Sequence, residues 1–97
     1  MTNTNTNNSV EEKLIGVGCY VWEKYGRKRI YINEDQLEKV FGLSISRYNS
    51  GWICSAFLNG EKISNSEARR LLAIKPYYDC LSGKFVGKLA PLPFFAA

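Results

Sequence analysis

The densest concentration of chemically useful side chains is a basic run, Lys24-Tyr25-Gly26-Arg27-Lys28-Arg29. These six positions hold four of the chain's 13 Lys and Arg residues, with Tyr25 among them. Cationic side chains neutralise phosphates, and an interleaved aromatic ring can stack on a base. Arginine can also grip a phosphate or carboxylate through two parallel hydrogen bonds. The run therefore favours binding of a nucleic acid or nucleoprotein; a solvated, charged hairpin tip that protects a sheet edge is the alternative.

Three further arginines, Arg47, Arg69 and Arg70, could extend a surface that binds anions. Arg69 and Arg70 lie opposite the apolar stripe of a predicted helix, so at least one of them faces solvent. The net charge of +4 also favours an anionic partner. The candidate nucleic-acid or anion-binding residues are therefore Lys24, Tyr25, Arg27, Lys28, Arg29, Arg47, Arg69 and Arg70.

Aromatic residues suggest a different use for the same domain. A sheet that packs one face on helices leaves a second face, and large exposed aromatics there indicate an interface. A protein-interaction module is thus the rival hypothesis, such as a small inhibitor or adaptor of the kind that a phage or mobile element encodes. It could also form a homodimer. The candidate protein-interface residues are Tyr20, Trp22, Tyr31, Trp52, Phe94 and Phe95.

The window 36–51, QLEKVFGLSISRYNSG, carries an apolar-Gly-apolar-Ser pattern in Phe41-Gly42-Leu43-Ser44. This window resembles the helix-turn-helix of small DNA-binding regulators. The resemblance implies a recognition helix that begins at ISRY, residues 45–48, with Ser46, Arg47 and Asn49 directed at base edges. A DNA-binding regulator of this type is the second alternative.

Catalysis finds little support in the residue types. The chain has no His, which excludes His-based triads and His-containing metal sites. Asp79 beside Cys80 lacks an activating base, and Gly16 and Gly18 precede a predicted strand instead of leading from a strand into a helix. We therefore expect a binding protein without enzymatic activity, metal or cofactor.

The three cysteines and the apolar pattern indicate a cytoplasmic protein. Cys19, Cys54 and Cys80 form neither a CxxC pair nor an even disulfide set, so we expect reduced thiols that pack as small apolar groups. No apolar run approaches the roughly 20 residues that a membrane-spanning helix needs, and we expect no membrane partner.

Turn and capping signals define the elements that position these residues. Tyr25-Gly26, Asn59-Gly60 and Leu81-Ser82-Gly83 predict three hairpins. Asn33 with Gln36, and Ser64 with Glu67, are capping-box patterns that predict a helix after each of the first two hairpins. The fold class is therefore α+β in the order ββα-ββα-ββ, an antiparallel sheet with two helices packed on one face.

Composition divides the chain into three parts. The Thr/Asn-rich start predicts a disordered polar leader over residues 1–12. Residues 13–88 carry the single α+β domain, and residues 89–97 form an apolar, Pro-containing C-terminal tail that lies in a groove of its own domain or of a partner.

Overall fold

The computed structural model describes residues 6–96, and the protein is an α+β domain, as the sequence predicts. In chain order the elements are α1 (Thr6–Gly16), β1 (Tyr20–Lys24), β2 (Arg27–Tyr31), the 3₁₀ helix η1 (Glu34–Gln36), α2 (Leu37–Phe41), β3 (Leu43–Arg47), β4 (Ile53–Leu58), β5 (Glu61–Ile63), α3 (Asn65–Ala73), β6 (Tyr77–Asp79) and β7 (Lys84–Val86). The predicted ββα-ββα-ββ order is recovered, with α1 and β3 added to it.

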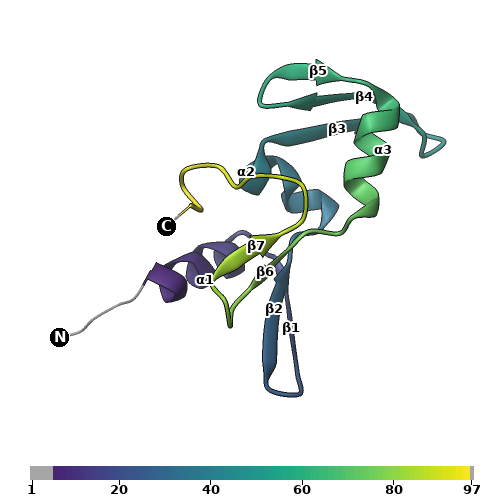
Figure 1. Cartoon of the computed structure of the whole chain (residues 1–97). Coiled ribbons are helices and arrows are strands. Elements are labelled where there is room, and N and C mark those ends of the chain that lie inside the picture. The colour runs from purple at the N-terminus through teal and green to yellow at the C-terminus, as the bar shows by residue number, and fades with distance from the viewer. Residues whose placement is uncertain (1–5, 97) are drawn as a thin grey trace.

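The described strands form two antiparallel sheets, where one sheet was expected. The first has the order β1-β2-β6-β7, and the second has the order β3-β4-β5. After β5, α3 carries the chain back so that β6 pairs with β2, with Ile30 opposite Tyr78. Figure 1 shows the two sheets at opposite ends of the molecule with α2 and α3 between them, and the β1–β2 hairpin projecting from the body.

Both two-residue hairpin turns lie where the sequence predicts a turn, and both have positive φ at their two central residues. Tyr25 and Gly26 have φ of 54° and 74°, and Asn59 and Gly60 have φ of 54° and 86°. Positive φ at both central positions is the signature of a type I′ turn, whose twist matches that of the flanking strands. The tip of the first hairpin therefore has a defined geometry.

The two predicted helix starts are also present. The Gln36 side chain accepts a hydrogen bond from the Asn33 backbone N–H at 3.1 Å, at the start of η1. The Ser64 hydroxyl accepts one from the Glu67 N–H at 3.1 Å, at the start of α3. Gly42, with φ of 78°, ends α2 in the left-handed region. Each cap satisfies a backbone group that the helix itself leaves unpaired.

The helix-turn-helix expectation is wrong, because the proposed recognition helix is a strand. Leu43–Arg47 is β3, and it pairs with β4 through Ile45 opposite Ala56. Leu43 and Ile45 alternate with serines, so a strand places both apolar residues on one face, toward the core. A helix would have distributed them around its circumference.

The predicted disordered leader is wrong for residues 6–12, which belong to α1; residues 1–5 lie outside the described residues. Val10 and Leu14, four positions apart, lie on one face of α1 and are 2% and 0% exposed. Both belong to the main core cluster, together with Ile30 and Tyr78 of the first sheet. The apolar spacing of Val10 and Leu14 outweighs the polar composition of this segment.

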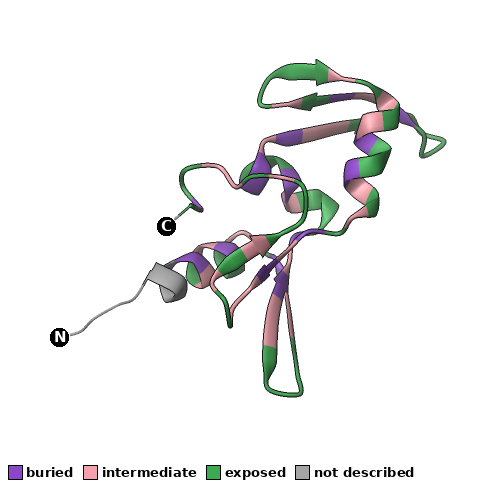
Figure 2. Ribbon diagram, viewed as in Figure 1, coloured by how far each residue is buried: buried purple, intermediate pink, exposed green. Residues whose placement is uncertain are grey.

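The C-terminal tail packs on its own domain. The Leu92 N–H donates to the Val40 carbonyl at 2.7 Å, and Phe95 is 3% exposed within the main core. Figure 2 shows the buried positions concentrated where the helices meet the two sheets, and the distal β1–β2 hairpin exposed. None of the helices in residues 6–96 has the length and hydropathy needed to cross a bilayer.

Candidate nucleic-acid interface

The two faces of the first sheet differ in what covers them. Strand register places Val21, Ile30, Tyr78 and Phe85 on one face, where they pack into the main core beside α1. The other face lacks this apolar packing and is called the open face below. Its residues are Tyr20, Trp22, Lys24, Arg27, Arg29, Tyr31, Tyr77, Asp79, Lys84 and Val86.

Arg29 occupies the centre of the open face, between aromatic rings from two neighbouring strands. Its guanidinium carbon lies 5.3 Å from the Trp22 ring centroid and 4.6 Å from the Tyr77 ring centroid. It donates a hydrogen bond to the Tyr31 hydroxyl at 3.2 Å, which raises the pKa of the guanidinium. The Tyr31 and Tyr77 rings are themselves in contact, with centroids 5.3 Å apart. This aromatic cluster therefore holds a planar cation in one position.

The charge of the open face is strongly positive. Lys24, Arg27, Arg29 and Lys84 share it with a single carboxylate, Asp79, which accepts a hydrogen bond from the Leu81 N–H at 3.0 Å. Within residues 6–96, none of these four cations forms an ion pair. This face can therefore attract an anionic group.

Tyr25 marks the outer end of this face. It is 85% exposed at the hairpin turn, and Lys24 Nζ lies 5.1 Å from its ring centroid. The basic tip and three residues of the predicted aromatic interface, Tyr20, Trp22 and Tyr31, thus form one continuous surface, although the sequence suggested two rival sites.

Lys28 does not belong to that surface. Its side chain points to the opposite face of β2, where Nζ lies 3.1 Å from Glu11 Oε1 of α1. This hydrogen bond raises the pKa of Lys28. Alternation along the strand explains the exclusion, because Lys28 is flanked by Arg27 and Arg29, which both face the other way.

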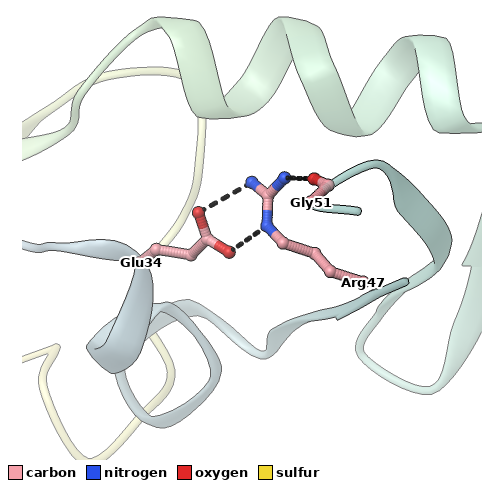
Figure 3. A network of polar contacts seen from close by, with 3 residues as sticks. All are labelled: Glu34, Arg47 and Gly51. Carbon is pink, nitrogen blue, oxygen red and sulfur yellow. Dashed lines mark hydrogen bonds and ion pairs between the residues drawn. The ribbon is translucent and has the colours of Figure 1, made fainter. Parts of the chain in front are cut away.

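Arg47 lies in a separate polar network, drawn in Figure 3. Its Nε and Nη2 donate to the two Glu34 carboxylate oxygens at 2.8 and 2.9 Å, and its Nη1 donates to the Gly51 carbonyl at 2.7 Å. The hydrogen bond from Arg47 lowers the pKa of Glu34. The two-pronged pair neutralises Arg47 and ties η1 to the end of β3.

The arginines of α3 also differ in their partners. Arg70 forms an ion pair with Glu67 at 2.7 Å within the helix, whereas Arg69 is exposed and has no ion pair among residues 6–96. Of the eight predicted anion-binding residues, Lys24, Tyr25, Arg27 and Arg29 share one surface. Arg69 lies apart from it, and Lys28, Arg47 and Arg70 are paired with carboxylates.

A hollow of about 530 Å³ adjoins the open face where the first sheet meets the end of α3. Tyr20 and Tyr31 of the open face form one wall, and Glu34, Leu72 and Lys75 lie around the rest. We call this the near hollow. Its size fits a small organic group such as a nucleobase, and its rings and lysine match the chemistry of the open face.

The predicted aromatic interface is divided by the structure. Tyr20, Trp22 and Tyr31 lie on the open face, but Trp52 is in the loop before β4 and is 69% exposed. Phe94 is 61% exposed, with Lys13 Nζ 4.6 Å from its ring centroid. Phe95 is a core residue, which removes it from any exposed interface.

Sequence reasoning missed Tyr77 and Lys84 as members of the site. The hairpin that carries them was predicted from its turn, but its pairing with β2 was not. The residues Tyr77-Tyr78-Asp79 indicate a strand whose successive side chains point to opposite faces. This local pattern does not indicate which strand pairs with it. Only the β2–β6 pairing shows that Tyr77 contacts Arg29.

The cysteines occupy three different environments, whereas all three were expected to pack as apolar groups. Burial raises the pKa of the Cys19 thiol to about 11. Burial also raises the pKa of the Cys80 thiol, and the nearby Glu11 carboxylate adds a smaller effect, so that this pKa is about 12. Cys54 is exposed beside the bulge between β3 and β4. In the described part of the chain, no three Cys, Asp or Glu side chains come together in a group that could hold a metal ion.

Comparison with known protein families, with curated proteins and with solved structures finds no match to this chain.

Proposed function

We propose that this protein binds single-stranded nucleic acid on the open face of its first sheet, without catalysis. The observation that carries the proposal is the central Arg29, held between Trp22 and Tyr77 on a surface with three more cations. Aromatic rings stack on bases irrespective of sequence, and lysines and arginines along the same path neutralise the backbone.

A single strand suits this surface better than a duplex. The bases of a duplex are stacked on one another inside the helix, whereas those of a single strand can be splayed onto aromatic side chains. The Trp22, Tyr31 and Tyr77 rings lie on neighbouring strands of a sheet, which offers successive stacking positions. The basic tip at Lys24 and Arg27 lies beyond them, where the backbone of a bound strand can pass.

The test is a titration of labelled oligothymidylate and oligouridylate, read by fluorescence anisotropy. Replacing Arg29 by Gln should weaken binding about tenfold, since it removes both a cation and the planar group between two rings. Lys62→Gln is the matched control, because it removes one exposed charge from the outer face of the second sheet. Absence of salt-dependent binding by the wild type, or equal losses in both variants, contradicts the proposal.

The edge of the first sheet supports a second candidate function, the capture of an extended protein segment. Among the strands of residues 6–96, β1 pairs only with β2, so its other edge offers backbone groups for an added strand beside Tyr20 and Trp22. Co-purification from lysate with and without nuclease separates the two functions. A stoichiometric protein that survives nuclease treatment favours this candidate, and nucleic acid that travels with the chain favours the first.

A further inference from the structure

A second hollow, of about 650 Å³, lies next to the near hollow on the side of the second sheet. We call it the far hollow. Trp52 and Arg69 line it together with Arg47, Gly51 and Leu72. Trp52 exposes 69% of its surface, although tryptophan side chains in folded domains are highly buried on average.

The two hollows share a boundary. Leu72 of α3 lines both of them, and the ion pair between Glu34 of the near hollow and Arg47 of the far hollow lies between them. Because the boundary consists of one leucine and one neutralised pair, it presents no net charge to a chain that crosses it. The near hollow in turn shares Tyr20 and Tyr31 with the open face.

The unpaired charged residues that line the two hollows are both cations. Lys75 lines the near hollow and Arg69 lines the far hollow, and neither forms an ion pair among residues 6–96. The one carboxylate that lines either hollow, Glu34, is occupied by Arg47. Aromatic walls with unpaired cations between them fit a phosphate backbone whose bases stack at intervals.

From this continuity we infer that one nucleic-acid strand runs from the open face, past the near hollow, to Trp52, where it stacks a further base. This inference rests on the proposed function and adds a prediction of the length of nucleic acid that fills the site. The full site spans both sheets of a molecule whose longest dimension is 49 Å. A short oligonucleotide fills the open face alone, and a longer one also reaches Trp52.

The test compares labelled oligothymidylates of about 5 and about 15 nucleotides, which lie near the two ends of the usual range of site sizes. Trp52→Ala and Arg69→Ala should each weaken binding of the long oligonucleotide, the first about tenfold, and leave the short one unchanged. Phe57→Ala is the control, because Phe57 is an exposed aromatic on the outer face of the second sheet. Thermal unfolding of each variant verifies that it is folded.

A second readout is independent of affinity. The chain has two tryptophans, so in Trp22→Phe all indole fluorescence comes from Trp52. The long oligonucleotide should quench this fluorescence on binding, and the short one should not.

The continuous path is overturned if Trp52→Ala weakens binding of the short and the long oligonucleotide equally, or if it weakens binding of neither. If Arg29→Gln still weakens both oligonucleotides in that case, the proposed function stands without it. If the wild type binds neither oligonucleotide, both proposals fail together.

Discussion

The guanidinium carbon of Arg29 lies 4.6 Å from the centre of the Tyr77 ring, in a contact between β2 and a strand that follows α3 in the chain. Trp22 flanks the same guanidinium at 5.3 Å, and the Tyr31 hydroxyl accepts a hydrogen bond from it. Fixing a long side chain before a ligand arrives lowers the entropy lost on binding. The consequences of this arrangement are open to experiment.

Charge and stacking on the open face should separate in a salt titration. Arg27→Ala removes an exposed cation, and the slope of log affinity against log salt should decrease in magnitude by about 0.7 for a single strand. Trp22→Ala removes a stacking ring and should weaken binding by about 1–3 kcal/mol with the slope unchanged. Reversing the charge of both Arg27 and Arg29 should weaken binding most. Identical slopes for wild type and Arg27→Ala would show that Arg27 contacts no phosphate.

The N-terminal helix should contribute to global stability. Leu14 is 0% exposed in the core, so Leu14→Ala should lower the free energy of unfolding by about 2–5 kcal/mol. Ile15, its neighbour on the exposed side of α1, is 49% exposed, and Ile15→Ala should change stability by about 0.5 kcal/mol or less. Urea unfolding measures both values. Similar small effects would mean that α1 is not docked on the sheet.

Two glycines with similar backbone angles should differ in their tolerance of alanine. Gly42 and Gly26 have φ of 78° and 74°, so a Cβ is unfavourable at both positions. At Gly42 the added Cβ would also clash with the Asn59 side chain, whereas at Gly26 it would meet no atom within 4 Å. Gly42→Ala should therefore lower the melting temperature more than Gly26→Ala. The reverse order would contradict the close approach of Asn59 to the end of α2.

The Glu34–Arg47 pair should stabilise the protein in a pH-dependent way. The pKa of Glu34 is lowered below its ordinary value of 4.5 by the hydrogen bond from Arg47. Its contribution is thus fully present above that value and is lost as the pH falls through the lowered pKa. Wild type and Glu34→Gln should differ in unfolding free energy at neutral pH and converge in acid. The difference should be small, because both side chains are partly exposed to solvent. A constant difference from neutral to strongly acidic pH would contradict this assignment.

The three cysteines should react at different rates with an alkylating agent. Cys54 is exposed, whereas the thiols of Cys19 and Cys80 have pKa values of about 11 and about 12 and form little thiolate near neutral pH. Mass spectrometry should show one rapid modification at Cys54, and all three only after unfolding. Cys54→Ser should abolish the rapid phase; its persistence would indicate that one of the other thiols opens readily.

Local sequence signals predict the turns and caps correctly because they act over three or four residues. Asn59-Gly60 adopts positive φ at low cost, and Ser64 caps α3 through a hydrogen bond to Glu67. These interactions depend little on the rest of the chain. The α+β class, the three hairpins and both capped helices follow from them.

Signals that depend on distant packing were missed or misassigned. The stretch Leu43–Arg47 was given a helical alternative, but the core selects a strand because that buries Leu43 and Ile45 together. The polar composition around Val10 suggested disorder, yet Val10 and Leu14, one turn apart on α1, are both buried in the core. Burial is shared by elements that are remote in sequence, so no short window contains it.

The sequence by itself determined the residue types of the candidate site, its basic hairpin tip and the alternation of faces along β2. Tertiary structure alone decided which of these residues act together. It placed Tyr77 against Arg29, paired Lys28 with Glu11, and buried Phe95 in the core. The physical reason is that burial of the whole core determines which strands pair and where the helices dock. That packing in turn determines whether each charged side chain faces solvent or lies beside a partner.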